Sequence, residues 1–149
     1  MYFYLLYMSQ IKFFYQTPLH NFKNRTALKT FLSSSALTYN RPIASLNIIF
    51  CSDEYLLSIN QGHLQHDYYT DIITFDLSPS VTDPIEGELY ISVDRVKENA
   101  ILHEEAYLKE LHRVVFHGLL HLLGFKDKNK ADQEVMRTKE DDFLAQYFA

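Results

Sequence analysis

Residues 117–127 read His-Gly-Leu-Leu-His-Leu-Leu-Gly-Phe-Lys-Asp, and this stretch decides the fold because it specifies a buried helix that carries two histidines. His117 and His121 stand four positions apart, so both imidazoles project from one helix face and can share a cation. The side chains around them, from Val114 to Leu123, are apolar almost all the way round, which is typical of a buried helix. Two buried imidazoles need partners, and a shared Zn²⁺ ion would supply both at once.

The end of this helix predicts a third ligand. Gly124 suits the left-handed position after a helix, so we expect a helix over residues 104–123 and then a reversal of the chain. The reversal would bring Asp127 back toward the histidines, where its carboxylate completes a three-ligand set for one zinc ion per chain. An open fourth position would hold a water acidified toward a pKa of about 7. The alternative is that the histidines are ordinary hydrogen-bonded side chains and that Asp127 is a solvated loop acid.

Gly118 separates the histidines and excludes one class of enzyme. A zinc protease carries its general-base glutamate at this position, so the pattern indicates a zincin-like metal site without the peptidase mechanism. A glycine inside a helix costs about 1 kcal/mol relative to alanine. We therefore expect a close approach to the backbone at Gly118, by a substrate or by a packed strand.

The remaining sequence predicts an α+β fold. Two strands that flank a tight polar loop can pair antiparallel, while the order of the whole sheet stays open. Asp94 is the expected N-cap of the helix that ends near residue 102, and Ser52 or Asp53 is the expected cap of a shorter helix. The other expected strands and helices are strands 10–16, 44–51, 71–77 and 88–93, and helices 24–37 and 129–148.

Length and composition favour one ordinary domain spanning residues 1–149. The chain is 47% apolar and 22% charged, with a net charge of −5, so nucleic acid would need a local basic surface. The single cysteine, Cys51, excludes an internal disulfide and a cysteine-based zinc site, and it fits a reducing cytoplasm. No apolar run approaches the roughly 20 residues needed to cross a bilayer. We interpret residues 1–7 as a wrongly assigned extension, with Met8 as the true start.

Three ordered motifs resemble one known family. The pattern H-G-x-L-H-L-x-G-[YF], followed by a ligand six residues after the second histidine, is similar to the signature of the YbeY family of rRNA maturation factors. Ile59-Asn60 with residues 66–75, and residues 87–92, resemble two further blocks of that family. The resemblance covers the chain from about Met8 to its C-terminus.

The resemblance implies a fold and a function. The expected fold is a mixed four-stranded sheet, with about five helices, around the helix that bears the histidines. The expected activity is that of a zinc-dependent endoribonuclease, specific for single-stranded RNA, in rRNA 3′-end processing and ribosome quality control. The expected partners are rRNA and the small ribosomal subunit, with no membrane and no DNA. His117 and His121 match the family's first two metal ligands.

Two departures from the family pattern bear on that activity. The third ligand is usually histidine, whereas Asp127 stands here, and its harder oxygen shifts preference toward Mn²⁺, Ni²⁺ or Co²⁺. The family often carries an arginine where this chain has His63-Leu64, and Leu64 cannot donate to phosphate. His66 can take over, since an imidazolium attracts a phosphate, or it is simply a loop histidine exposed to water.

Several further residues are candidates with an ordinary alternative. Lys126 and Lys128, with Lys130, form a basic edge suited to an RNA backbone or to plain solvation. Arg113 can reach RNA or form a salt bridge with Glu110.

Four other polar residues have weaker claims. Thr70 and Asp71 open a strand and either contribute to the site or only bond the loop. Ser92 positions water or bonds the backbone. His103 and His112 are expected on helix surfaces.

Two functions from other classes remain open. One is a non-catalytic ribosome-assembly factor whose metal only holds a loop, which Leu64 in the arginine position favours. The other is a metallohydrolase of a different phosphoester. No general base is evident in the motif, so the proton acceptor is unassigned.

Overall fold

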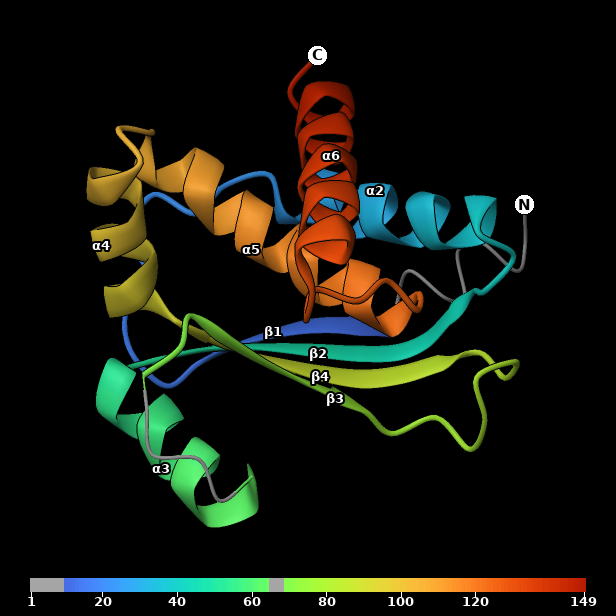
Figure 1. Cartoon of the computed structure of the whole chain (residues 1–149), viewed down its shortest axis with the longest axis horizontal. Helices are drawn as coiled ribbons and strands as arrows, with labels where there is room; N and C mark the ends of the chain where they lie inside the picture. Colours follow the sequence, from blue (N-terminus) through green and yellow to red (C-terminus); the bar gives the residue numbers. More distant parts are fainter. Residues whose placement is uncertain (1–9, 65–68) are drawn as a thin grey trace.

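A four-stranded mixed sheet forms one layer of the molecule (Figure 1). Its spatial order is β1-β2-β4-β3; β1 and β2 and then β2 and β4 pair in parallel, whereas β3 and β4 are antiparallel. The α+β class and the mixed sheet are thereby confirmed, as is an antiparallel pair across a polar loop. The strands are β1 (Ile11–Tyr15), β2 (Ile43–Cys51), β3 (Ile72–Asp76) and β4 (Ile85–Ser92).

The structure is a computed structural model that describes residues 10–64 and 69–149, without the side chains of residues 63–64. The proposed start at Met8, the preceding seven residues and His66 lie outside the described residues, as does the side chain of Leu64.

Within the described part of the chain, five helices surround the sheet. In Figure 1, α2, α5 and α6 lie on one side of the sheet, α4 stands at one end, and α3 lies on the opposite side. None of these helices is long and apolar enough to cross a membrane. The helices are α2 (Arg25–Thr38), α3 (Asp53–Leu64), α4 (Val93–Leu102), α5 (Tyr107–Leu122) and α6 (Lys130–Tyr147).

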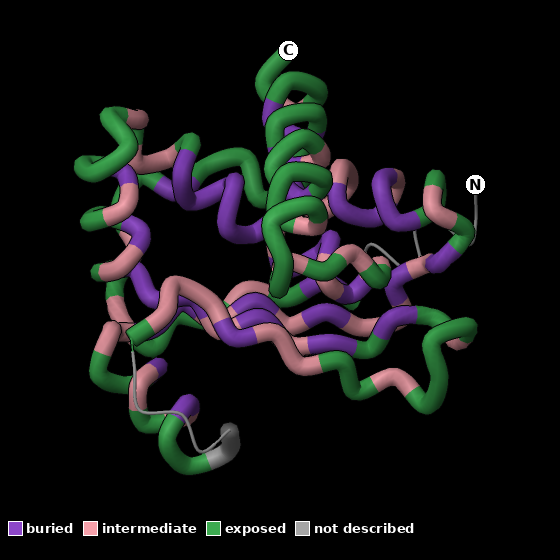
Figure 2. The backbone as a smooth tube through the Cα atoms, viewed as in Figure 1, coloured by how far each residue is buried: buried purple, intermediate pink, exposed green. Residues whose placement is uncertain are grey.

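Helix α5 is the centre of the core, as its apolar composition predicts. Most of its residues are buried, and Figure 2 shows buried parts of this helix above the buried strands. A Cβ placed on Gly118 would lie 2.8 Å from the side-chain ends of Ile72 on β3 and Leu89 on β4. The close approach expected at Gly118 is therefore that of the sheet, which brings β3 against the helix that carries the histidines.

Most predicted boundaries are correct within one residue, and the exceptions have local causes. β4 begins at Ile85 instead of residue 88, because Ile85 donates its N–H to the Pro42 carbonyl at 2.8 Å and extends the pairing with β2. The N-cap of α4 is Ser92, not Asp94, since the Ser92 hydroxyl accepts the Arg95 N–H at 3.1 Å. α5 begins at Tyr107 instead of residue 104, because Glu104 has a left-handed backbone.

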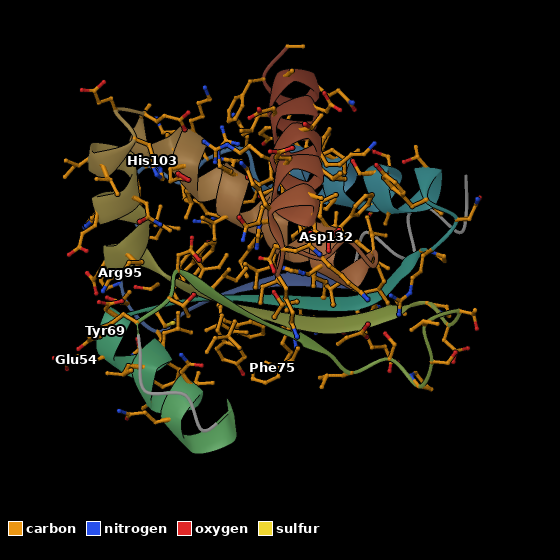
Figure 3. The ribbon with its side chains drawn as sticks, in the orientation of Figure 1. Glu54, Tyr69, Phe75, Arg95, His103 and Asp132 are labelled. Carbon is orange, nitrogen blue, oxygen red and sulfur yellow. The ribbon has the colours of Figure 1, made fainter. Side chains whose placement is uncertain are left out.

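The prediction that His112 lies on a helix surface is wrong. Its exposed fraction is 5%, and its ring packs against the rings of Phe22, Phe116 and Tyr147. Its Nδ1–H donates to the Leu108 carbonyl at 2.6 Å. Burial lowers the pKa of His112 despite that hydrogen bond, so the ring stays neutral in the core at neutral pH. His103 is exposed at the end of α4, as predicted (Figure 3).

Gly124 ends α5 as expected. Its φ is 101°, the Phe125 N–H bonds the Leu120 carbonyl at 3.0 Å, and the Gly124 N–H bonds the His121 carbonyl at 3.0 Å. These two bonds form a Schellman motif. The motif turns the chain so that residue 127 returns toward the helix.

Alanine at position 124 is expected to destabilise the protein by about 1–2 kcal/mol, because a Cβ is strained in the left-handed region. The measurement is urea unfolding of Gly124→Ala beside the control Gly62→Ala. Gly62 is exposed in α3, and a Cβ added there would have nothing within 4 Å, so alanine should stabilise the helix by up to about 1 kcal/mol. Equal shifts of both variants in the same direction would contradict this explanation.

Candidate metal centre

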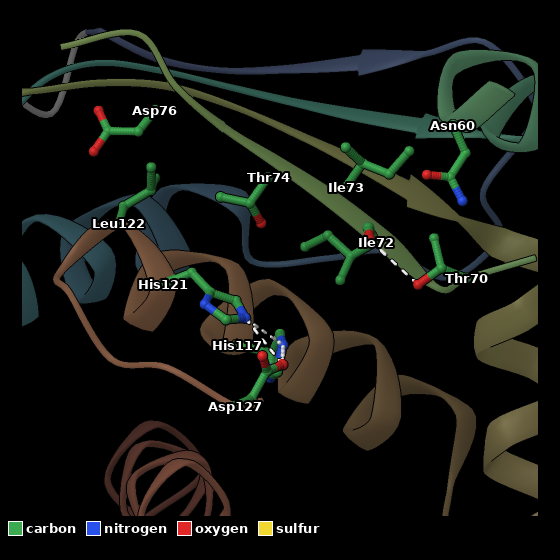
Figure 4. A pocket seen from close by; sticks show the side chains of 10 residues that line it. All are labelled: Asn60, Thr70, Ile72, Ile73, Thr74, Asp76, His117, His121, Leu122 and Asp127. Atoms are coloured by element: carbon green, nitrogen blue, oxygen red, sulfur yellow. Dashed lines mark hydrogen bonds and ion pairs between the residues drawn. The ribbon is translucent and has the colours of Figure 1, made fainter. Parts of the chain in front are cut away.

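The structure brings the three predicted ligands together at the end of α5 (Figure 4). The Nε2 atoms of His117 and His121 are 3.0 Å apart. An Oδ2 atom of Asp127 lies 3.1 Å from the His121 Nε2 and 3.3 Å from the His117 Nε2. All three side chains are partly exposed, so the cluster is accessible from solvent.

The other ring nitrogens decide what this cluster can hold. The Nδ1 atom of His121 lies 3.0 Å from the Phe125 carbonyl, which only accepts, so Nδ1 carries the proton. The Nδ1 atom of His117 likewise donates to the Glu140 carboxylate at 2.7 Å. With both Nδ1 atoms directed at acceptors, the two Nε2 atoms and a carboxylate oxygen face one point. When the rings carry protons only on Nδ1, these three atoms are all acceptors, and such a set fits a cation.

Glu140 is the functional residue that sequence reasoning missed. It lies on α6 with an exposed fraction of 5%, bonded through one oxygen to His117 and through the other to Arg113 at 3.3 Å. A signal was available, because position 140 continues the apolar face formed by Met136, Phe143 and Leu144. A glutamate on a buried helix face needs a specific partner.

Carboxylates control the protonation of His117. Burial alone would lower the pKa of His117, but the hydrogen bond and charge of Glu140 together with the charges of Asp71 and Asp127 outweigh it, so the pKa is raised. The pKa of Asp71 is itself raised by burial, against the lowering effect of His117. The Asp71 carboxylate accepts from the Asn99 side chain at 3.3 Å. Asp71 acts on His117 through its charge.

Arg113 lies inside the fold, with a side-chain exposure of 6%. Its guanidinium contacts Asp141 at 2.8 Å and Glu140 at 3.3 Å, whereas Glu110 is 3.9 Å away. This arrangement favours the salt-bridge alternative for Arg113 over contact with RNA. The main carboxylate partners come from α6, not from Glu110 on the same helix.

The remaining candidates occupy different environments. Lys126 and Lys128 are exposed on either side of Asp127. The Ser92 hydroxyl donates to Asp53 at 3.1 Å while it caps α4, so it serves the fold. The Thr70 hydroxyl points to the Ile72 carbonyl at 3.4 Å.

A cavity of about 400 Å³ lies beside the cluster, between α5 and β3. Figure 4 shows the histidines and Asp127 on one side of it and the β3 side chains on the other. Its walls combine metal-ligand candidates, hydroxyls and an amide, which suits a polar substrate. The lining residues are Asn60, Thr70, Ile72, Ile73, Thr74, Asp76, His117, His121, Leu122 and Asp127.

Comparisons with known proteins identify one family. A family model described as endoribonuclease YbeY matches residues 11–148. The chain is 50% identical over 135 residues to an endoribonuclease YbeY of Cytophaga hutchinsonii, covering 91% of this chain and 94% of that protein. It is 46% identical to one of Flavobacterium psychrophilum, covering 82% and 86%. A Thermotoga maritima solution structure matches with a TM-score of 0.62 at 27% identity, covering 93% and 89% of the two chains.

Replacing Glu140 with glutamine should weaken zinc binding by about 10- to 100-fold. The variant loses the charged acceptor that orients the His117 ring and raises the basicity of its Nε2 atom. The dissociation constant is measured by competition with a chromophoric chelator. The control is Glu134→Gln, which removes the same charge from an exposed position on α6. Equal zinc affinity of the two variants would show that Glu140 does not act on the metal centre.

Proposed function

Because the chain belongs to the endoribonuclease YbeY family, we propose that it is a metal-dependent endoribonuclease that cuts single-stranded RNA. The known role of this family is rRNA maturation, so the proposed substrate is the 3′ end of rRNA in the small ribosomal subunit, in the cytoplasm. The observation that carries the proposal is the convergence of two histidine Nε2 atoms and one carboxylate oxygen beside a polar cavity.

His117, His121 and Asp127 would hold one zinc ion in a zincin-like arrangement of two histidines on one helix and a third ligand beyond its end. When bound, the metal supplies a Lewis acid for a scissile phosphate and lowers the pKa of water. The protein's own contribution is orientation. The Phe125 carbonyl and the Glu140 carboxylate fix the ring tautomers, and the Schellman turn at Gly124 fixes the position of Asp127.

Contacts with RNA beyond the metal would come from the exposed basic edge. Lys126 and Lys128 flank Asp127, and their positive charge suits a phosphate backbone. His66 is a further proposed phosphate contact, in place of the arginine that Leu64 replaces. No proton acceptor is assigned to a residue.

A non-catalytic assembly factor is the second candidate, favoured by Leu64 where the family often has arginine. In that case the metal would hold the 124–129 turn without cleavage. The two candidates differ in one observable, which is cleavage of single-stranded RNA by the zinc-loaded protein.

The endoribonuclease proposal predicts that the zinc-loaded protein cuts single-stranded RNA and leaves a matched duplex intact. His121→Ala should reduce cleavage to background, and a chelator should do the same to the wild type until zinc is returned. The control is His103→Ala, an exposed histidine outside the cluster. Gel analysis of a labelled RNA measures this, with circular dichroism to confirm folding. Cleavage that survives in His121→Ala would assign the activity to another site or to a contaminant.

Replacing Asp127 with histidine should raise the preference for Zn²⁺ over Mn²⁺, because imidazole is a softer donor than carboxylate. The ratio of the two dissociation constants, measured by competition titration, tests this. Asp142→His is the control, since position 142 is exposed on α6. An unchanged ratio in Asp127→His would mean that residue 127 does not contact the metal.

A further inference from the structure

We propose that the open edge of β3 binds the unpaired bases of the RNA next to the metal centre, through main-chain groups of Ile72, Thr74 and Asp76. The inference rests on the proposed function and adds to it the structural element that would recognise the RNA strand. Its support is the hydrogen-bonding pattern of β3 together with the position of that strand beside the cavity.

β3 is an edge strand, paired on one side only. It has β4 as its neighbour, and within the described residues no strand pairs with its other edge. Two hydrogen bonds show which residues of this strand bond to β4. The Ser92 N–H donates to the Asp71 carbonyl at 2.9 Å, and the Leu77 N–H donates to the Glu86 carbonyl at 2.7 Å. Residues of an antiparallel strand alternate between bonded and non-bonded pairs. Asp71, Ile73, Phe75 and Leu77 therefore face β4.

The peptide groups of the alternate residues, Ile72, Thr74 and Asp76, point away from the sheet. The Thr70 hydroxyl, which approaches the Ile72 carbonyl from outside the ladder, agrees with this direction. The outward groups repeat about every 6.8 Å along an antiparallel strand. They form a row of alternating N–H donors and carbonyl acceptors.

The residues that carry this row line the cavity beside the candidate metal cluster. Ile72, Thr74 and Asp76 line the same cavity as His121 and Asp127 (Figure 4). The contact of the Ile72 side chain with Gly118 on α5 holds the strand in place. The Phe75 side chain lies on the opposite face of the sheet, toward α3 (Figure 3).

The far end of β3 is also held to α5. The Arg41 guanidinium contacts the Asp76 carboxylate at 3.5 Å and donates to the Leu122 carbonyl. Because Leu122 follows His121 directly, this side chain joins the strand to the end of the helix that carries the histidines. The edge is thus positioned before any ligand arrives, which lowers the entropic cost of binding.

The chemistry of the row matches bases better than phosphates. A phosphate offers only acceptors and carries negative charge, and Asp76 and Asp127 stand in the same cavity. A base edge offers donors and acceptors together, as the strand edge does. In a duplex the Watson–Crick edges are already paired, so only unpaired bases are free to bind. Selectivity for single strands would then follow from the main chain and would not need the missing arginine.

The test is amide hydrogen exchange of the zinc-loaded protein, with and without a single-stranded 2′-O-methyl RNA that resists cleavage. Fluorescence anisotropy reports binding separately. We expect exchange of the Thr74 and Asp76 amides to slow by about tenfold or more, as for a hydrogen bond of ordinary net strength. The Ile73 and Phe75 amides, already bonded to β4, should change little, and the matching duplex should protect none.

A proline variant provides the second measurement. Thr74→Pro removes an outward N–H that makes no ladder bond, and proline is tolerated at such edge positions. Oligonucleotide affinity should fall by about 3- to 10-fold, with zinc content unchanged. The control is Tyr15→Pro on β1, the opposite edge of the sheet, where the Gln16 N–H bonds Phe50 and the Tyr15 N–H therefore points outward. That variant should bind as the wild type does.

The outcomes separate this inference from the proposed function. RNA that binds or is cut without protecting the Thr74 and Asp76 amides overturns the inference alone. Failure of the wild type both to bind and to cut single-stranded RNA overturns the proposed function and the inference with it. Protection of the edge by an extended peptide, and not by RNA, would identify β3 as a protein-binding edge and overturn the inference.

Discussion

The contact between α5 and the sheet at Gly118 is the constraint on which the site depends. Since a Cβ there would meet Ile72 and Leu89 at 2.8 Å, only a glycine lets the helix lie this close without rearrangement. The approach places the two histidines on either side of Gly118 at the edge of the sheet, beside β3. The cavity, its hydroxyls and the outward peptide groups of β3 are therefore near the cluster as a consequence of helix packing.

Buried charge is organised around the same helix. Arg113 on α5 and Glu140 on α6 form an ion pair in the core, and the other carboxylate oxygen of Glu140 accepts a hydrogen bond from His117. A buried carboxylate without partners would be costly, so α6 must dock with Glu140 in register with both side chains. The packing of the C-terminal helix therefore also orients the His117 ring. The ligand cluster is the place where three elements, α5, the turn after it and α6, meet.

The parts of the site that sequence reasoning predicted are local in the chain. The i, i+4 spacing places His117 and His121 on one helix face, and Gly124 determines the reversal that returns Asp127. The apolar face of α6 marks position 140 as buried, but the partners of Glu140 and Arg41 and the pairing of β3 depend on tertiary register, which no local pattern encodes. The burial of His112 escapes sequence reasoning for the same reason, because two of the rings that cover it, Tyr147 and Phe22, come from outside α5.

Zinc K-edge X-ray absorption of the loaded wild-type protein tests the central claim, that two histidines and one aspartate form the metal centre. We expect multiple-scattering features of two imidazoles and a shell of nitrogen and oxygen at about 2.0–2.2 Å. Asp127→Ala should keep the two imidazoles and change the oxygen shell. A spectrum with three imidazoles, or with fewer than two, would contradict the assignment of His117, His121 and Asp127.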